Sequence, residues 1–333
     1  MKPSVALIVP FYNNFLVLKT CLVSLHKTVE DPQIVVVDDS VDEIEHRKCL
    51  EFCEEAKLHY VRMMRNSGFI QATLAGAKVL RTDWLCFINS DTEAQAYGWL
   101  DKMIPTDPQE AVVGAKLIFP DIEGHPFRGK LQHAGVAVIN GGLPFHPFRG
   151  LPADLPEANV RRSVRAVTGA VFLVRGSVWD ELGGWDQKLG RGVFEDVDFC
   201  WRVVQAGHKV IYEPAVTFVH HESASLDSAG NHPLHMYSAA NSQYILAKWA
   251  NTPFLQSDEH LFGLPAYQPP VLDLGPRLRI MLKMTQSNGL AAFLADMAQK
   301  LPPEQRKRFA EELLQISDNI PLKKREFPKR NKH

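Results

Sequence analysis

Short apolar runs alternate with stretches of helical periodicity at the start of the chain. Residues 5–9 (VALIV) and 34–37 (IVVV) are unbroken apolar runs, which are typical of strands buried on both faces. Between them, leucines and a cysteine within residues 16–25 recur at the spacing of one helix face. Asn13 and Asn14 stand where a helix cap is expected. The pattern predicts a βαβ unit with two parallel strands.

The alternation continues to residue 88, and mostly strands are predicted after it. The second part of the alternation predicts helices near 41–54 and 68–80 and strands near 58–63 and 84–88. Further strands are predicted near 112–119, 136–139, 171–175, 210–212 and 216–219. Together these elements predict the α/β class, with a doubly wound sheet flanked by helices.

One stretch near residue 200 combines a strong helical pattern with a cluster of acids. Its apolar positions, 197, 200, 201 and 204, recur at i, i+3, i+4 and i+7. Glu195 and Asp196 fall in the first turn, where carboxylates are stabilised by unpaired backbone N–H groups and by the helix dipole. Asp198 and Arg202 have the spacing of an i, i+4 ion pair. A purely capping role for the first two acids is one interpretation, and a catalytic role is the other.

Composition predicts a soluble protein with a sizeable core. The chain has 333 residues, of which 45% are apolar, and its formal net charge of −1 gives no reason to expect binding to nucleic acid. Its apolar runs are shorter than the roughly 20 residues that span a bilayer, and we expect no signal peptide. The five cysteines include no C-x-x-C pair, so we expect reduced core thiols in the cytoplasm.

Polar residues gather where the first four predicted strands end. The segments are 10–13 (PFYN), 38–40 (DDS), 65–68 (RNSG) and 89–92 (NSDT). In doubly wound sheets, ligands bind in the crevice beyond the carboxyl ends of the strands, although single residues of these types also cap helices. The G-x-G-x-x-G fingerprint and the P-loop are both absent from the sequence. The four polar ends therefore predict a ligand site other than those for dinucleotides or simple NTP hydrolysis.

These motifs stand in the order and approximate spacing of family 2 glycosyltransferases, which the chain resembles over roughly residues 4–250. The motifs are VALIVPFYN at 5–13, VVVDDS at 35–40, NSGF at 66–69, NSD at 89–91 and EDxDF at 195–199. Bacterial members of rhamnosyltransferase-like or O-antigen type are similar in LQHAG at 131–135, HxFRG at 146–150, TGA at 168–170 and HHES at 220–223. The resemblance implies a GT-A fold with a doubly wound mixed sheet, and inverting transfer of a sugar from a nucleoside diphosphate.

The resemblance also implies a donor site along the strand ends. Asp38 or Asp39 would contact the base, and Asp91 would coordinate a divalent metal bridging the diphosphate. Cations held by one or two carboxylates plus phosphates are the usual arrangement for Mg²⁺ or Mn²⁺. The family's metal motif usually reads Asp-x-Asp, whereas this chain has Asn89 first, and its amide can still hydrogen-bond a ribose hydroxyl or a metal-bound water. The expected donor-binding residues are Pro10, Tyr12, Asp38, Asp39, Asn66, Gly68, Asn89 and Asp91.

A histidine at the end of the last predicted strand is expected to complete the metal site. His220 and His221 are adjacent, and adjacent residues on a strand face opposite sides, so only one reaches a given site. In the resembling family a histidine at this end of the domain often completes the metal shell, and His220 has the better spacing from Asp196. A histidine that is hydrogen-bonded in a partly buried loop is the alternative. An imidazole ligand would suit Mn²⁺ better than Mg²⁺.

Inverting transfer needs a base that removes the proton of the acceptor hydroxyl. Among the acids at 195–199 the resemblance selects Asp196, while Asp198 would engage Arg202 or the acceptor. The loop at 141–156 is rich in glycine and proline, and its length favours a substrate lid. Arginines at 161, 162 and 165 would meet phosphate or protect a strand edge. The expected acceptor-binding residues are Glu195, Asp198, Trp201, Arg202, His146 and Arg149.

The expected organisation is a catalytic domain at 1–250, with a nucleotide-binding half at 1–110 and an acceptor-binding half at 111–250. Residues 251–333 are predicted to form a helical extension with a basic tail, which either attracts the anionic inner face of the cell membrane or is a solvated end. The expected partners are a nucleotide-sugar donor and a glycan or lipid-linked acceptor of surface polysaccharide or glycoconjugate assembly. The alternatives are a sugar-phosphate nucleotidyltransferase, whose usual G-x-G-x-R loop is absent, and a non-catalytic nucleotide-sugar-binding protein, which Asn89 would favour.

Overall fold

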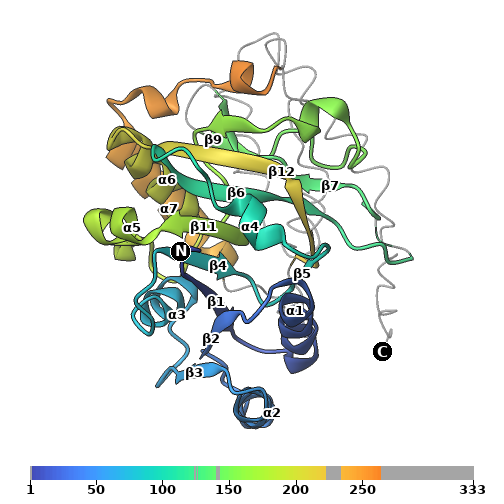
Figure 1. Ribbon diagram of the computed structural model, residues 1–333. Coiled ribbons are helices and arrows are strands. Elements are labelled where there is room, and N and C mark those ends of the chain that lie inside the picture. The colour runs from blue at the N-terminus through green and yellow to red at the C-terminus, as the bar shows by residue number, and fades with distance from the viewer. Residues whose placement is uncertain (1, 124, 126, 140–142, 223–233, 264–333) are drawn as a thin grey trace, which may run out of the picture. The chain divides into compact units, whose positions relative to one another are not determined.

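A mixed sheet of ten strands organises the part of the chain that the computed structural model describes, namely residues 2–123, 125, 127–139, 143–222 and 234–263 (Figure 1). Its strand order is β10-β12-β6-β11-β4-β1-β2-β3, with β5 paired to β12 and β7 paired to β6. A second, two-stranded sheet contains β8 and β9. The α/β class and the mixed, doubly wound sheet are therefore as predicted.

The first half of the sheet is parallel, as the βαβ pattern predicts. β1 pairs with β2 and β4, and β2 pairs with β3, all in parallel. The carboxyl ends of these strands consequently lie at one edge of the sheet. The elements are β1 (Val5–Phe11), α1 (Phe15–Thr28), β2 (Gln33–Asp38), α2 (Glu43–Glu55), β3 (His59–Arg62), α3 (Phe69–Gly76) and β4 (Trp84–Ile88).

The second half adds antiparallel strands to the same sheet. β11 lies antiparallel between β4 and β6, and β12 runs parallel to β6. The elements up to β11 are β5 (Thr92–Ala94), α4 (Trp99–Met103), β6 (Glu110–Ile118), β7 (Leu131–His133), β8 (Ala137–Ile139), β9 (Leu143–Phe145), η1 (Pro156–Asn159), β10 (Arg162–Val164) and β11 (Val171–Arg175). They are followed by α5 (Gly176–Leu182), η2 (Gln187–Leu189), α6 (Glu195–Gln205), β12 (Lys209–His220), α7 (Leu234–Trp249), η3 (Pro253–Leu255) and η4 (Glu259–Phe262).

One long strand, β12, replaces the two short strands that were predicted at 210–212 and 216–219. Its pairing with β6 is irregular between Glu213 and Thr217. Pro214 lies in this interval, and proline cannot donate a hydrogen bond to a ladder, so it interrupts the pairing without ending the strand. The prediction of two strands was wrong for this reason.

Helices cover both faces of the sheet, and each face has its own apolar core. Side chains from α1, α2 and α4 pack on one face, including Leu22, Cys49 and Trp99. Side chains from α3, α5, α6 and α7 pack on the other, including Phe199. All five cysteines are buried and free, which confirms the prediction of core thiols.

The start of α1 is capped differently from the sequence-based expectation. Asn14 occupies the cap position with φ +70°, but its side chain accepts no capping hydrogen bond from the helix. Instead, the carboxylate of Glu45 in α2 accepts from the backbone N–H of Phe15. The helix N-terminus is thus stabilised by a neighbouring helix, a contact that local sequence does not encode.

The arginines at 161, 162 and 165 lie in and beside β10, the strand at one edge of the sheet. Arg161 pairs with Glu110 and Glu213 at 2.6 and 2.7 Å. Arg162 and Arg165 donate to backbone carbonyls, and Arg165 lies 3.6 Å from the carboxylate of Asp258. These contacts favour the structural interpretation over phosphate binding.

Residues 251–263 pack on the preceding part of the chain. Phe254 stacks on Trp201 with ring centroids 5.6 Å apart, and Asp258 accepts from the N–H of Val138 at 2.5 Å. The first compact unit runs over Met1–Pro265, past the predicted boundary at 250. The predicted helices and the basic tail of the extension lie outside the described residues. In the described part of the chain, no helix has the length and apolarity needed to span a membrane.

Candidate active site

Loops from both halves of the sheet are joined by hydrogen bonds beyond the carboxyl ends of the strands. Asp39 after β2 accepts from the N–H groups of Ser67 and Gly68 at 2.6 and 2.8 Å. Arg191, in the loop before α6, donates to the Asn66 carbonyl at 3.2 Å. The loops that follow β2, β3 and η2 therefore form one connected rim.

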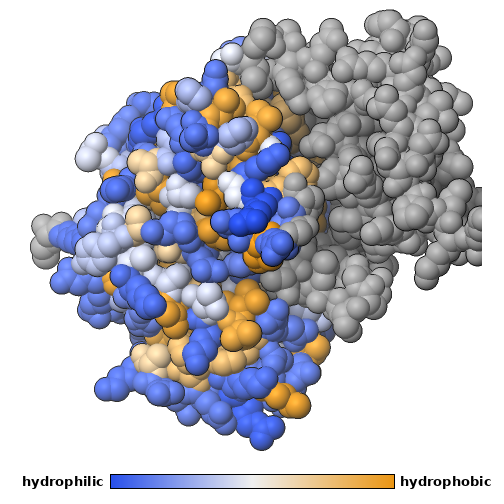
Figure 2. Space-filling view, turned by 90° about the vertical axis from the view of Figure 1, so that its right-hand side faces the viewer, coloured by the Kyte–Doolittle hydropathy of each residue, from blue (hydrophilic) through white to orange (hydrophobic). Residues whose placement is uncertain are grey.

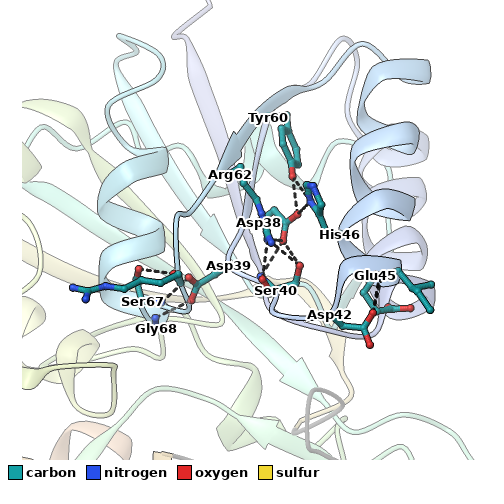
Figure 3. Close-up of polar contacts among 12 residues, drawn as sticks. Asp38, Asp39, Ser40, Asp42, Glu45, His46, Tyr60, Arg62, Ser67 and Gly68 are labelled. Atoms are coloured by element: carbon teal, nitrogen blue, oxygen red, sulfur yellow. Dashed lines mark hydrogen bonds and ion pairs between the residues drawn. The ribbon is translucent and has the colours of Figure 1, made fainter.

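Asp38 lies at the centre of a buried polar network that braces this rim (Figure 3). Its carboxylate accepts from Ser40, Tyr60 and Arg62 and contacts His46, at distances from 2.5 to 2.9 Å. Burial opposes ionisation, but the hydrogen bonds from Ser40, Tyr60 and His46 hold the pKa of Asp38 below its ordinary value. Asp38 is fully buried and both its oxygens are engaged. Asp39 is also buried and both its oxygens accept backbone hydrogen bonds, so the choice between the two as the base contact stays a prediction.

Two further side-chain oxygens at the rim are buried without a hydrogen-bond partner. They belong to Asn13, after β1, and Asn66, after β3. A buried acceptor with no donor costs roughly 1–3 kcal/mol, so these atoms suit a ligand that brings N–H or O–H groups. Of the other predicted donor residues here, Tyr12 is half-buried after β1, whereas Pro10 lies inside β1, paired with Val37.

Arg191 is a rim residue that sequence reasoning missed. Its backbone and Cβ pack against Gly68, where an added Cβ would come within 2.7 Å, and Gly68 has φ +84°. Both features require glycine at this position. Burial raises the pKa of Asp39, while the Ser67 and Gly68 N–H groups and the Arg191 charge oppose the rise. A signal was present in the sequence, since Arg191 stands between two glycines just before the acidic motif.

Asp91 lies just before β5, and His220 ends β12, the strand with which β5 pairs. The Oδ1 atom of Asp91 lies 3.2 Å from Nε2 of His220. Burial alone lowers the pKa of His220, but the Asp91 carboxylate outweighs burial and raises it. His221 has another partner, Glu93, at 2.6 Å, in keeping with the alternation of side chains along a strand. Asn89 is half-buried, and its N–H donates to the carbonyl of Ala170 at 2.8 Å.

The chemistry of the Asp91 and His220 side chains fits a divalent cation that is shared with a phosphate ligand. A carboxylate oxygen and an imidazole nitrogen are both suitable donors for Mn²⁺. No group of three or more His, Cys, Asp or Glu side chains within the described ranges could hold a metal ion by itself. A cation here would therefore depend on oxygens of a diphosphate, which is how Mg²⁺ is usually bound.

The acidic pair at the start of α6 faces the junction of β4 and β11. The half-buried Asp196 accepts from Gly169 N–H and Val197 N–H, both at 2.8 Å. Glu195 is buried, and its Oε2 has no partner. Burial and the nearby Asp196 charge raise the pKa of Glu195 to about 8. The pKa of Asp196 is also raised by burial, but its backbone N–H partners oppose the rise. The two carboxyl groups are close enough that the charge of one disfavours ionisation of the other.

The backbone before this pair is strained. Val193 and Phe194 have φ values of +78° and +72°, and a β-branched residue in this region is a genuine outlier. Asn241 in α7 is buried and donates to the carbonyls of Leu189, Gly192 and Val193. Strain of this kind persists where neighbouring groups enforce it, and it is concentrated at functional sites.

Three predicted acceptor residues lie on the buried face of α6, and the structure corrects these predictions. Asp198 is fully buried and is bonded to Arg202, Lys248 and Trp249 at 2.8 to 3.0 Å. Arg202 also donates to the carbonyls of Leu182 and Gly184. Trp201 is fully buried between aromatic rings. These side chains anchor α7 and α5 to α6. Asp198 and Trp201 are not accessible to an acceptor, and Arg202 is half-buried.

His146 and Arg149, the other predicted acceptor residues, contact groups near the end of β12. Arg149 pairs with Glu222 at 2.5 Å and lies over the ring of Phe119.

Burial and the Arg149 charge lower the pKa of His133 to about 3, so the ring of His133 is neutral. Its Nε2 accepts from two backbone N–H groups, so Nδ1 carries the proton and donates to Nδ1 of His146 at 2.9 Å. The proton of His146 is therefore on Nε2. Residues 141 and 142, the start of the predicted lid at 141–156, lie outside the described residues.

A hollow of about 170 Å³ borders Asp91 on the α1 side of the sheet. It is lined by Leu16, Val17 and Thr20 of α1 and by Asp91, Thr92, Glu93 and His221. Figure 2 views the molecule from the side on which α1 lies, and there apolar side chains gather in separate patches on a mainly hydrophilic surface. The neighbourhood of Asp91 thus includes space that a small ligand group can occupy.

Comparison with solved structures identifies the fold. A crystal structure of GalNAc-T7 with UDP, GalNAc and Mn²⁺ matches with a TM-score of 0.55 and 16% identity, covering 76% of this chain and 52% of that one. The mannosyltransferase PcManGT of Pyrobaculum calidifontis, in complex with GDP-Man and Mn²⁺, matches with a TM-score of 0.53 and 16% identity, covering 96% of this chain and 80% of that one. The fold is the GT-A fold, as predicted.

Two curated relatives from bacteria are longer than this chain. The O-antigen biosynthesis protein RfbC of Myxococcus xanthus is 29% identical over 67% of this chain and 18% of its own length. The pre-mycofactocin glycosyltransferase of Mycobacterium tuberculosis is 27% identical over 67% of this chain and 43% of its own length. This chain thus spans less than half the length of either protein. The match to RfbC confirms the expected likeness to bacterial proteins of O-antigen type.

Family models match both halves of the sheet. A model described as glycosyl transferase family 2 matches residues 6–164, and one described as glycosyltransferase like family 2 matches residues 151–232. The two matches include every strand-end motif and the acidic motif of α6. With the GT-A fold and these two matches, the chain belongs to glycosyltransferase family 2.

Proposed function

We propose that this chain transfers a sugar, with inversion, from a nucleoside-diphosphate sugar to a hydroxyl group of a glycan or lipid-linked acceptor. The observation that carries the proposal is the link between Asp196 and the end of β4. The N–H of Gly169 donates to Asp196, and the carbonyl of the next residue, Ala170, accepts from Asn89. The acid that would accept a proton and the strand end that precedes Asp91 are thus held by two adjacent residues, Gly169 and Ala170.

The proposed chemistry assigns different tasks to the two acids of α6. Asp196 removes the proton of the acceptor hydroxyl while that oxygen bonds to the anomeric carbon. The bond from that carbon to the diphosphate oxygen breaks, and its electron pair leaves with the diphosphate. Glu195, whose pKa is raised to about 8, keeps its proton, so the negative charge stays on Asp196. Separated pKa values in a pair of acids are a common basis for such a division.

The donor would lie along the strand ends, with its base toward Asp39, Asn13 and Asn66. Asp91 and His220 would hold Mn²⁺ or Mg²⁺, which when bound would stabilise the charge of the leaving diphosphate. The acceptor would approach past Glu195, His146 and Arg149. The likeness to RfbC supports a role in surface polysaccharide or glycoconjugate assembly, and the buried free thiols suit the reducing cytoplasm.

A nucleotide-sugar panel tests the proposal. Melting temperature is measured with UDP-, GDP- and dTDP-sugars, with and without Mn²⁺ or Mg²⁺, because a ligand that binds the folded state raises it. The expected result is stabilisation by one nucleotide class, followed by slow release of the nucleoside diphosphate. Stabilisation by a nucleoside triphosphate and a sugar phosphate, with release of pyrophosphate, would instead identify a nucleotidyltransferase. Binding of a nucleotide sugar without any turnover would identify a non-catalytic binding protein.

A further inference from the structure

Gln132 is an extra residue in the short strand β7. In the pairing of β6 with β7, Leu117 lies opposite His133 and Ile118 lies opposite Leu131, so Gln132 has no partner on β6. This is the arrangement of a β-bulge, which redirects side chains and is common near active sites. Gln132 is nevertheless buried, with 2% of its surface exposed. A buried polar side chain at a bulge needs a partner.

That partner is His220, on the far side of β6. In the sheet order, β6 lies between β12 and β7. The Oε1 atom of Gln132 lies 2.7 Å from Nδ1 of His220, and its Nε2 donates to the backbone carbonyl of His220 at 3.3 Å. One amide therefore holds both the ring and the main chain of His220.

The two contacts together fix which ring nitrogen faces Asp91. A backbone carbonyl is only an acceptor, so the NH₂ group of Gln132 must point to it and Oε1 must point to the ring. Oε1 is also only an acceptor, so Nδ1 of His220 must carry a proton. Nε2 is then the ring atom available for a ligand, and it is the atom 3.2 Å from Asp91.

We propose that Gln132 is the positioning residue that holds His220 with Nε2 toward Asp91, and thereby sets the affinity of this pair for a divalent cation. The inference rests on the proposed function, because it needs the metal site suggested there. Outer-shell partners of metal-binding histidines fix the tautomer and the ring orientation, and their loss typically costs 10–100-fold in metal affinity. In this proposal, the bulge in β7 allows the Gln132 amide to reach across β6 to His220.

Mn²⁺ binding tests the inference without any measurement of turnover. Free Mn²⁺ is followed by electron paramagnetic resonance in the wild type and in Gln132→Met, with UDP and with GDP. Methionine has a similar shape but neither hydrogen bond, so the dissociation constant is expected to rise roughly 10–100-fold. Gln132→Glu, which keeps an acceptor for Nδ1–H, is expected to bind within a few-fold of wild type. His221→Ala, whose ring contacts Glu93, serves as the matched control and should bind like wild type.

A spectroscopic readout separates positioning from general damage to the fold. The Asp91 carboxylate also attracts a proton to Nε2, so the readout is made in metal-free Asp91→Ala protein at alkaline pH. There, ¹⁵N shifts assigned by comparison with His220→Ala should show a single Nδ1–H tautomer when Gln132 is present and a mixture with Gln132→Met. A Gln132→Met protein that is folded, keeps one tautomer and binds Mn²⁺ like wild type would overturn the inference alone. A wild type that binds no Mn²⁺ with either nucleotide would overturn the proposed metal site as well.

Discussion

Oδ1 of Asp91 lies 3.2 Å from Nε2 of His220, although one residue follows the fourth strand and the other ends the twelfth. The two side chains come from opposite halves of the chain and are nine-tenths buried. A cation between them would therefore connect the predicted nucleotide-binding half of the chain to the predicted acceptor-binding half. This contact allows separate predictions for Asp91 and Asn89 on one side and for His220 and His221 on the other.

The first prediction concerns Asp91 and Asn89. Asp91→Ala is expected to abolish the increase in donor affinity that Mn²⁺ produces, because Asp91 supplies the negative charge. Asn89→Ala should weaken donor binding only about tenfold, the scale of one hydrogen bond. Donor titration by calorimetry with and without Mn²⁺ measures both. Equal Mn²⁺-dependent affinity in Asp91→Ala and wild type would refute the metal assignment.

The second prediction compares the two adjacent histidines. His220→Ala should lower metal-dependent turnover roughly 10²-fold or more, because even outer-shell partners of such ligands are worth 10–100-fold. His221→Ala removes only the contact with Glu93 and should stay close to wild type. Turnover is measured for both variants over a range of Mn²⁺ concentrations. If His221→Ala is the inactive variant, the ring of His221 and not that of His220 belongs to the metal site.

The grouping of the polar strand ends was predictable from sequence because strand ends follow from apolar periodicity. β4 and β11 have the predicted bounds, and the polar segments after β1 to β4 lie at one edge because these strands are parallel. The hydrogen-bond network around Asp38 was not predictable. It depends on Tyr60 and Arg62, which reach Asp38 from β3, and side-chain contacts between strands are not encoded in either local motif.

The roles within α6 were only half predictable for a similar reason. The 3.6-residue period identified its buried face, and Trp201 belongs to that face as the pattern requires. Yet Asp198 is buried by Lys248 and Trp249 of α7, which no local pattern joins to α6. Gln132 was also missed, because a β-bulge is visible only in the strand pairing.

A third prediction follows from the raised pKa of Glu195. Its ordinary value is 4.5 and its folded value is about 8, so between these pH values the folded state binds more protons than the unfolded state. Stability therefore falls as pH rises from about 4.5 to about 8. Glu195→Gln cannot ionise, so this contribution should vanish. The variant should match wild type near the lower pH and be more stable than wild type near the upper pH.

Urea unfolding of both proteins across this pH range measures the effect. The informative quantity is the difference between the two free energies of unfolding at each pH, because other titrating groups, such as His133, are common to both proteins. A constant difference would mean that Glu195 is ionised in the folded state, and the proposed division between Glu195 and Asp196 would fail with it.

The last prediction separates the two aspartates of α6. Asp196→Asn should keep the fold and the donor affinity, because an amide oxygen can still accept from Gly169 or Val197 and the loss of the other bond costs ~1 kcal/mol. Turnover should fall roughly 10²-fold or more, the usual scale for removal of a general base. The rate is measured at saturating donor and acceptor, with circular dichroism and melting temperature as controls for folding.

Asp198→Asn is the matched control, because it makes the same chemical change two residues away. Asp198 is fully buried among Arg202, Lys248 and Trp249, and neutralising one member of a buried ion network costs roughly 3 kcal/mol or more. This variant should therefore lose stability, while the fraction that stays folded retains its turnover. A folded Asp196→Asn protein that turns over within a few-fold of wild type would leave Asp196 as a helix cap. The base would then have to be sought elsewhere on the rim.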